Sequence, residues 1–248
     1  MSIHEGKFTF DNPISFTDEI LFYSATMKDY YQFYYCAEVL LIDKDSVPDI
    51  EVISMAYLDY LFKLSQEDSL VAARLYFLLS LVTKTNAEDI KLGVQDEEII
   101  LKIGKSVFNS SDFDKMKEII CEQNLLRVAD TTIAKELRDL MSEAKRYKQK
   151  ISGEKPATLE DQVVCVMIST ALTLEEIENL SIRKFIKILE RVDHKLHYEI
   201  YLSAHMSGFA DLKDKSILKH WMANLDKDRF DDVKISLDEV KNSGGLKN

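Results

Sequence analysis

The sequence predicts a mainly α-helical protein with a small β element, and three observations point to that class. Gly (7) and Pro (3) are both scarce among the 248 residues, so few residues interrupt long helices. Apolar residues recur at helical spacing over most of the chain. Only residues 7–24 and 90–103 carry the alternation and the β-branched or aromatic residues that are typical of strands.

Residues 7–24 are expected to be extended. Lys7 to Phe10 alternate in polarity, Asp11-Asn12-Pro13 is typical of a turn, and Leu21 to Tyr23 favour strands. The segment therefore predicts a β-hairpin or a pair of short strands.

Three helices are expected next. The first begins after Thr26, whose hydroxyl suits an N-cap with Asp29 at the capping-box position, and it runs to about Asp43. The second begins near Pro48, because a missing N–H costs nothing in the first turn of a helix, and it continues to about Phe62. The third spans roughly residues 67–83.

The pattern changes to short strands near residue 90. Residues 90–94 and 98–103 are predicted as two strands joined by the polar turn Gln95-Asp96-Glu97. A helix over about residues 112–123 follows them, with Ser110 and Ser111 as capping residues.

A change in composition indicates the domain boundary. Charged residues dominate 135–150, and Ser, Gly and Pro follow within 151–157. We therefore expect a mostly helical first domain at residues 1–150 with short strands, a linker at 151–157, a small helical bundle at 158–225 and a flexible polar tail at 226–248.

The predicted bundle contains four helices. A helix runs from Thr158 to about Ala171, and Thr173 and Glu176 form a capping box for a short one. A long helix begins after Ser181 and ends before Gly208, a residue type that suits the position after a helix. A last short helix begins at Ser216.

Charge and composition narrow the classes of partner. The net charge is −11, from 43 acidic and 32 basic residues, and a negative surface repels nucleic-acid phosphates and anionic membranes. The longest apolar run is far shorter than the ~20 residues of a membrane span, and residues 1–10 lack the apolar centre of a secretory signal. The three separated cysteines are typical of reduced thiols, so we expect a soluble intracellular protein.

The sequence motifs predict no enzyme. GxGxxG, GxxxxGK[ST], GxSxG and HExxH are all absent. His194 and His197 lie three residues apart on a predicted helix, but His205 is too far along that helix to share a metal with them. We therefore predict no catalytic residue, no cofactor and no metal. A metal-dependent enzyme built around His194 and His197 stays an alternative, which metal analysis of untagged protein tests.

Two groups of aromatic, Met and His side chains are candidates for partner binding. Residues 30–35 hold more aromatic side chains than one helix face can bury, so the helix is either buried on two sides or has one side facing a partner. The same alternatives apply to residues 205–222. The predicted partner-binding residues are Tyr31, Tyr34, Tyr35, His205, Met206, Phe209, Trp221 and Met222.

Several stretches of apolar and charged residues carry a family resemblance. They are residues 27–49, 112–124, 173–181, 191–194, 204–208 and 219–221. They resemble proteins encoded in tail modules of phages of Gram-positive bacteria, in particular tail assembly chaperones. Such chaperones are helical proteins that coat the tape-measure protein, keep it soluble, help to recruit tail-tube subunits and are absent from the finished virion.

The resemblance implies a function and its partners. It implies a non-catalytic tail assembly chaperone in the cytoplasm of the infected bacterial host, with the phage tape-measure protein as partner and tail-tube subunits as further partners. Self-association is a separate expectation. A binder of a long helical protein needs apolar grooves and a charged exterior, and this composition supplies both ingredients.

One alternative function accompanies this interpretation. A structural tail or baseplate subunit retained in the virion is the runner-up, and mass spectrometry of virions tests it. Some members of the family exist in short and long forms made by ribosomal frameshifting, with 151–157 as the candidate junction here.

Overall fold

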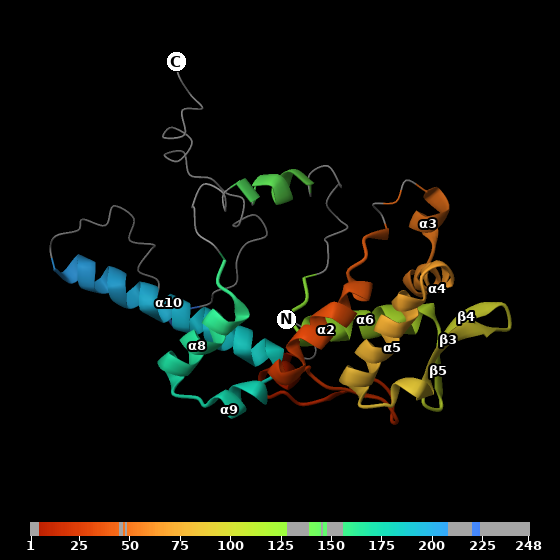
Figure 1. Cartoon of the computed structure of the whole chain (residues 1–248), viewed down its shortest axis with the longest axis horizontal. Coiled ribbons are helices and arrows are strands. Elements are labelled where there is room, and N and C mark those ends of the chain that lie inside the picture. Colours follow the sequence, from red (N-terminus) through yellow and green to blue (C-terminus); the bar gives the residue numbers. More distant parts are fainter. Residues whose placement is uncertain are drawn as a thin grey trace, which may run out of the picture. The chain divides into compact units, whose positions relative to one another are not determined.

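The computed structural model describes residues 5–44, 47, 49–127, 139–144, 146–147, 156–207 and 220–223. The protein is mainly α-helical with two small antiparallel sheets, which confirms the predicted fold class (Figure 1). The chain forms two compact units: unit 1 comprises residues 1–130 and 162–190, and unit 2 comprises residues 131–161 and 191–248. The predicted domain boundaries stay a prediction, and residues 151–155 of the expected linker and the expected tail at 226–248 lie outside the described residues.

The N-terminal part of unit 1 contains most of the helices and both sheets. The helices are α1 (Glu5–Thr9), α2 (Tyr30–Ala37), α3 (Ile50–Ser54), α4 (Tyr57–Glu67), α5 (Ser69–Thr83) and α6 (Ser110–Gln123), with short 3-10 turns η1 (Met27–Asp29), η2 (Glu38–Leu40) and η4 (Ala87–Asp89). The strands are β1 (Ile14–Ser15), β2 (Leu21–Phe22), β3 (Ile90–Gln95), β4 (Glu98–Ile103) and β5 (Ser106–Phe108). β1 pairs with β2, and the second sheet has the order β3-β4-β5.

The expectation for residues 7–24 is half correct. The predicted pair of short strands is present as β1 and β2, with Ile14 opposite Phe22. The predicted extended stretch at residues 7–10 is wrong, because residues 5–9 form helix α1. Phe8 is buried there, and the Arg183 guanidinium lies 4.8 Å from the centre of its ring. A tertiary contact therefore decided the conformation of this segment against its local strand preference.

The hairpin predicted around residue 96 is present. β3 and β4 pair antiparallel, with Gln95 opposite Glu98 and only two residues between them. Those residues, Asp96 and Glu97, have φ angles of 51° and 65°. Positive φ at both central positions is the requirement of the two-residue turn whose twist matches a hairpin. The third strand, β5, was not expected from the sequence.

Two of the predicted helices differ from the structure, one in its first turn and the other by a break in its middle. The hydroxyl of Thr26 donates to the Asp29 carboxylate at 2.9 Å instead of capping a backbone N–H, so the first turn is η1 and α2 begins at Tyr30. The helix expected from near Pro48 to about Phe62 is divided into α3 and α4, because Met55 is extended, and Pro48 itself lies outside the described residues. Tyr57, buried at the start of α4, donates to the Val39 carbonyl at 2.8 Å, and this contact favours the break.

The core of unit 1 lies between helices and the second sheet. α4 packs against α5 and α6, and each of these three helices also contacts β3 or β4. α2 packs against α5. Most of the largest fully buried side chains come from these elements, from the strand β2 and from the turn η2: Phe22, Phe33, Leu40, Leu58, Leu61, Leu75, Leu78, Leu79, Ile90 and Phe113. Ile14 of β1 and Phe185, near the start of the helix Ile182–Met206, complete the set.

Two buried polar residues at the end of α6 attach the N-terminal segment to the core. Asn124 is fully buried; its Oδ1 accepts from the Ala25 N–H at 2.8 Å and its Nδ2 donates to the Ile120 carbonyl at 2.9 Å. Gln123 is also buried, and its Nε2 donates to the Phe22 carbonyl at 3.2 Å. Buried polar groups are retained where they are hydrogen-bonded, so these amides hold residues 22–25 in place.

The C-terminal helices are α8 (Leu159–Thr170), α9 (Leu174–Glu178) and α10 (Ile182–Met206). The predicted capping box is confirmed: the Thr173 hydroxyl accepts from the Glu176 N–H at 3.3 Å, and the Glu176 carboxylate accepts from the Thr173 N–H at 2.8 Å. The Glu176 carboxylate accepts from both the N–H and the hydroxyl of Thr173, and these two bonds to its charged form lower the pKa of Glu176. The start of α10 follows Ser181 as expected, whereas Gly208 lies outside the described residues. Residues 216–219 of the last predicted helix also lie outside them, and Trp221 at its expected end lies in a turn.

The segment before α2 also contacts the turn between α9 and α10. The Met27 N–H donates to the Leu180 carbonyl at 2.8 Å, and the Ile182 N–H donates to the Ala25 carbonyl at 2.9 Å. The first turns of α10 thereby join α6 and the N-terminal segment within unit 1. Among the described residues, no helix has the length and apolarity that a membrane crossing requires.

Candidate partner-binding site

Helix α2 presents three different faces, and this division separates the predicted tyrosines. Phe33, Cys36 and Ala37 are buried in the core. Tyr34 is half-buried and lines a groove. Tyr31 and Tyr35 point outward and are 74% and 53% exposed. The structure therefore assigns Tyr31 and Tyr35 to one surface and Tyr34 to another.

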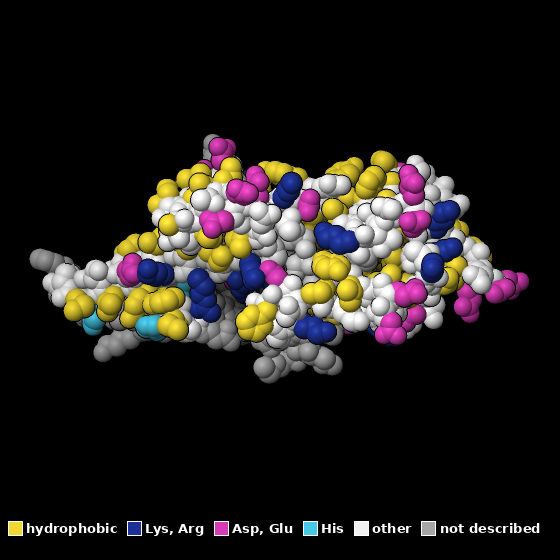
Figure 2. Space-filling model, turned by 90° about the horizontal axis from the view of Figure 1, so that it is seen from below, with side chains coloured by type: hydrophobic (Ala, Val, Ile, Leu, Met, Phe, Trp, Pro, Cys, Tyr) yellow, Lys and Arg dark blue, Asp and Glu magenta, His cyan; other side chains and the backbone are white. Residues whose placement is uncertain are grey.

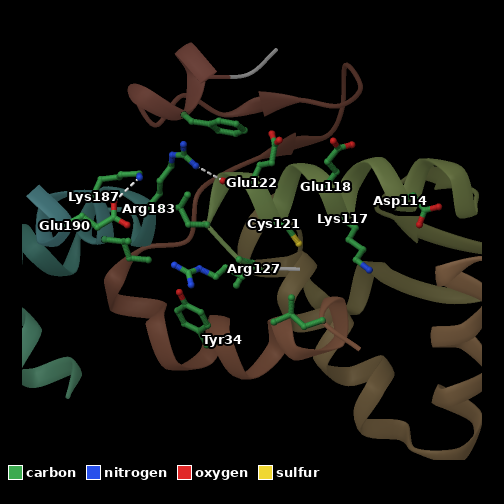
Figure 3. Close-up of a pocket in the computed structure, with 15 residues that line it drawn as sticks. Tyr34, Asp114, Lys117, Glu118, Cys121, Glu122, Arg127, Arg183, Lys187 and Glu190 are labelled. Atoms are coloured by element: carbon green, nitrogen blue, oxygen red, sulfur yellow. Dashed lines mark hydrogen bonds and ion pairs between the residues drawn. The ribbon is translucent and has the colours of Figure 1, made fainter. Parts of the chain in front are cut away.

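The groove that Tyr34 lines is a feature of unit 1, and it runs along α6 (Figure 3). Its volume is about 1210 Å³. Small-molecule sites commonly have about 300–1,000 Å³, so this groove is large for a metabolite and suits a polypeptide segment. The lining residues are Phe8, Tyr34, Leu41, Asp114, Lys117, Glu118, Cys121, Glu122, Leu125, Leu126, Arg127, Arg183, Ile186, Lys187 and Glu190.

The floor of the groove is apolar. Phe8, Cys121 and Leu126 are buried there, and four further apolar or aromatic lining residues are only half-buried. These four are Tyr34, Leu41, Leu125 and Ile186. Half-buried apolar side chains around a concave floor can lose further water contact when a partner binds, which is the source of affinity in hydrophobic grooves.

Charged side chains border this floor. Asp114, Glu118 and Glu122 are exposed and follow one another at four-residue spacing along α6, so they lie on one side of that helix. Figure 3 shows the carboxylates of Glu118 and Glu122 on one side of α6 and Lys117 on the other. Within the described ranges, no ion pair joins Asp114 or Glu118 to another residue.

Cationic side chains gather at the C-terminal end of α6. Arg183 donates from Nη1 to the Glu122 carbonyl at 2.6 Å, a carbonyl of the last helical turn. Lys187 forms an ion pair with Glu190 at 2.9 Å, and Arg127 also lines this end of the groove. Positive groups are favoured at a helix C-terminus because they complement the helix dipole. The groove therefore has an acidic side along α6 and a more basic end.

The ionisable groups of the floor are kept neutral. Burial raises the pKa of Cys121 to about 11, against a smaller lowering by the nearby Lys117 ammonium. Burial, with a smaller contribution from Tyr30, also raises the pKa of Tyr34, whose ring centre lies 4.6 Å from that of Tyr30. A nucleophilic cysteine needs a lowered pKa, because the thiolate is the reactive form. The floor is thus organised for apolar contact.

This arrangement predicts the order of thiol alkylation. We expect iodoacetamide at pH 8 to modify Cys165, which is half-exposed, well before Cys36 and Cys121, which are both buried. The pKa of Cys121 also leaves only about one thiol in a thousand ionised at that pH. Peptide mapping by mass spectrometry measures the order, with urea-unfolded protein as the control in which all three thiols react. Native Cys121 reacting as fast as Cys165 would contradict the described groove floor.

The second group of predicted residues does not form one cluster. His205 and Met206 lie exposed in the last turn of α10, where Met206 is 77% exposed. The segment with Trp221 and Met222 lies beside the middle of α10, since Arg191 donates from Nη1 to the Trp221 carbonyl at 2.8 Å. Fourteen residues of helix, about 21 Å, separate Arg191 from His205.

The remaining residues of this group have different surroundings. Met222 is exposed and Trp221 is half-buried, while the ring of the neighbouring His220 lies 5.3 Å from that of Tyr198. Phe209 lies outside the described residues. These contacts all belong to unit 2.

Of the two histidines considered as a metal site, His197 has contacts within its own helix, whereas the Nε2 atom of His194 is buried with no hydrogen-bond partner in the described part of the chain. The His197 Nδ1 lies 2.9 Å from the Asp193 carbonyl oxygen and 3.3 Å from the Asp193 carboxylate. Among the described residues, no three His, Cys, Asp or Glu side chains converge as metal ligands would.

Of the residues that line the groove, the sequence predicted only Tyr34 as partner-binding. The walls of the groove come from α1, α2, α6 and α10, which are separated by tens of residues along the chain, so no local pattern connects them. A further sequence pattern that could have indicated the groove is the four-residue spacing of Asp114, Glu118 and Glu122. Such spacing is common on solvated helices, so it is only weakly specific.

The chain is similar to a family of phage proteins over part of its length. Residues 148–226, which are 79 of the 248, match the family model of the YomV second domain, a phage-derived family of the type found in Bacillus phage SPBeta. The match supports a phage origin for this protein. No curated protein and no solved structure matches the chain.

Proposed function

We propose that the protein is a non-catalytic phage tail assembly chaperone that binds a helical segment of the tape-measure protein in the groove of unit 1. The observation that carries the proposal is the groove itself, with its apolar floor and charged borders. The match to a phage-derived family supports the phage context, and the resemblance to tail assembly chaperones supplies the partner.

The size of the groove suits a helix. An α-helix with its side chains is about 10–12 Å across and rises 5.4 Å per turn, so each turn occupies roughly 400–600 Å³. A volume of about 1210 Å³ therefore accommodates two to three turns. An amphipathic helix of that length inserts an apolar stripe into such grooves, with contacts at i, i+3, i+4 and i+7.

The charges around the groove select the kind of helix that binds. The carboxylates of Asp114 and Glu118 favour a partner with Lys or Arg beside its apolar stripe, because complementary charges fix orientation and exclude wrong partners. The net charge of −11 serves a second purpose, since surplus charge of one sign keeps a complex with an aggregation-prone partner dispersed. Such a chaperone acts in the cytoplasm of the infected host before the tail is complete, and tail-tube subunits are further partners.

Co-expression tests this proposal. The tape-measure protein of the same phage genome should be mostly insoluble when expressed alone, and it should become soluble and co-purify when this chain is present. An unchanged soluble fraction together with the absence of co-purification would reject the proposal. Mass spectrometry of purified virions distinguishes a chaperone, which is missing from the particle, from a tail or baseplate subunit at fixed copy number.

A further inference from the structure

The outward face of α2 carries a stripe of four exposed residues with a symmetric order. Lys28, Tyr31, Tyr35 and Glu38 follow one another at three- and four-residue spacing, so they share one face of η1, α2 and η2. The two tyrosines lie two residues on either side of position 33. Lys28 and Glu38 lie five residues on either side of it, about 15 Å apart along the axis. The stripe thus has an aromatic middle, a positive end and a negative end.

Helix α5 extends this surface. The Arg74 guanidinium lies 4.2 Å from the centre of the Tyr35 ring and 3.0 Å from the Glu38 carboxylate. Leu70 and Phe77 precede and follow Arg74 by one helical turn, and they are 53% and 50% exposed. Tyr35, Leu70 and Phe77 therefore lie around Arg74, and Tyr31 precedes Tyr35 by one helical turn. Figure 2 shows hydrophobic side chains at the surface among charged ones on one face of the molecule.

We propose that this α2–α5 surface binds a second copy of the chain around a two-fold axis that passes near position 33. A symmetric dimer brings the same patch of both copies together, so the patch must be complementary to itself. Rotation about this axis places Tyr31 opposite Tyr35 of the other copy, and Lys28 opposite Glu38. Both copies then gain two aromatic contacts and two pairs of opposite charges.

The opposite charges at the two ends of the stripe favour a second copy of the chain as the partner that binds there. A stripe with the same charge at both ends repels its own copy, whereas opposite charges at equal distances from the centre attract it. Glu38 stays available for this contact, because its side chain is 62% exposed although it also pairs with Arg74. The surface is separate from the groove, which Tyr34 lines from another face of α2, so dimerisation does not depend on the tape-measure protein.

The size of the surface sets the expected strength. Four partly exposed side chains amount to a few hundred Å² of apolar area, the size of the largest patch on a typical monomer. Small interfaces give weak, transient association. We therefore expect the mean mass in sedimentation equilibrium to rise from 28.6 kDa toward twice that value as the protein concentration increases from about 10 to 500 μM.

Charge reversal in two separate chains tests the proposed geometry. In a dimer of the Lys28→Glu variant, position 28 of each copy places a Glu opposite Glu38 of the other, and in a dimer of the Glu38→Lys variant two Lys face each other in the same way. Both arrangements are repulsive, so each variant should stay monomeric over the same concentrations. An equimolar mixture of the two variants restores both attractive pairs, and it should form a heterodimer as tightly as the wild type associates. Native mass spectrometry resolves the species when one variant is labelled with ¹⁵N.

A substitution pair tests the aromatic contacts. Tyr31→Ser should abolish self-association, whereas Tyr147→Ser, which removes a tyrosine that is 60% exposed elsewhere, should leave it unchanged. A wild type that stays monomeric at the highest concentration would overturn the proposal. So would charge-reversal variants that dimerise alone, or a mixture of the two that stays monomeric.

Discussion

Replacing Ile186 by Glu is expected to weaken binding of the tape-measure protein by about 100-fold or more, because a charge in the centre of a hydrophobic contact is costly to desolvate. Ile186 lines the groove from α10 and is half-buried, so the Glu side chain reaches water in the free protein and the fold tolerates it. In the complex the same carboxylate faces the apolar stripe of the bound helix. The soluble fraction of the co-expressed tape-measure protein and its recovery with this chain give the measurement.

Ile168→Glu is the matched control for this substitution. Ile168 lies on α8, is 80% exposed and does not line the groove. The control makes the same chemical change on another helix of the C-terminal half, so it should leave the solubilising activity near that of the wild type. Equal losses in both variants would show that the groove is not the binding site, even if the protein is a chaperone. Circular dichroism of both variants checks that the helices are retained.

Replacing Asn124 by Ala is expected to lower the free energy of unfolding by about 2–4 kcal/mol. The substitution removes the side-chain oxygen that accepts from the Ala25 N–H and the side-chain nitrogen that donates to the Ile120 carbonyl. The buried Ala25 N–H is then left without its side-chain partner. A buried donor without a partner costs about 1–3 kcal/mol in addition to the lost packing. Urea unfolding followed by circular dichroism measures the change.

Asn179 provides a control at an equivalent helix position. Asn124 follows the last residue of α6, and Asn179 follows the last residue of α9. Each side chain donates to the carbonyl four residues earlier, but Asn179 is exposed. Asn179→Ala should therefore change stability by no more than about 0.5 kcal/mol. Similar losses in both variants would mean that the link to residue 25 contributes little.

Local patterns predicted those elements whose signal lies within one short segment. The hairpin of β3 and β4, the capping box of Thr173 and Glu176, and the helix α5 are present as expected. Each of them depends on turn chemistry or periodicity that neighbouring residues supply. The extended conformation expected for residues 7–10 is wrong, because residues 5–9 are helical and Phe8 packs against Arg183, a contact that no local pattern records.

For the candidate site, the sequence predicted individual residues but not which of them lie together on one surface. The density of aromatic residues over 30–35 identified Tyr31, Tyr34 and Tyr35, but only the structure divides them between an outward stripe and the groove. His205 and Trp221 were grouped by composition, yet they lie at different places along α10. Composition shows which side chains are present, and spacing shows which of them share a face of one helix. Neither shows which side chains from different helices share a surface.

The sequence by itself determined the helical class, the strongly negative charge and the hairpin at residue 96, and its match to the YomV second domain supports a phage origin. Only the tertiary structure decided which face of α2 is buried, where the groove lies and how residues 22–27 are held between α6 and α10. The physical reason is the distance along the chain over which each kind of interaction acts. Propensity, capping and periodicity act over a few residues, whereas burial and concavity are set by contacts between segments 100 or more residues apart, as between Phe22 and Gln123.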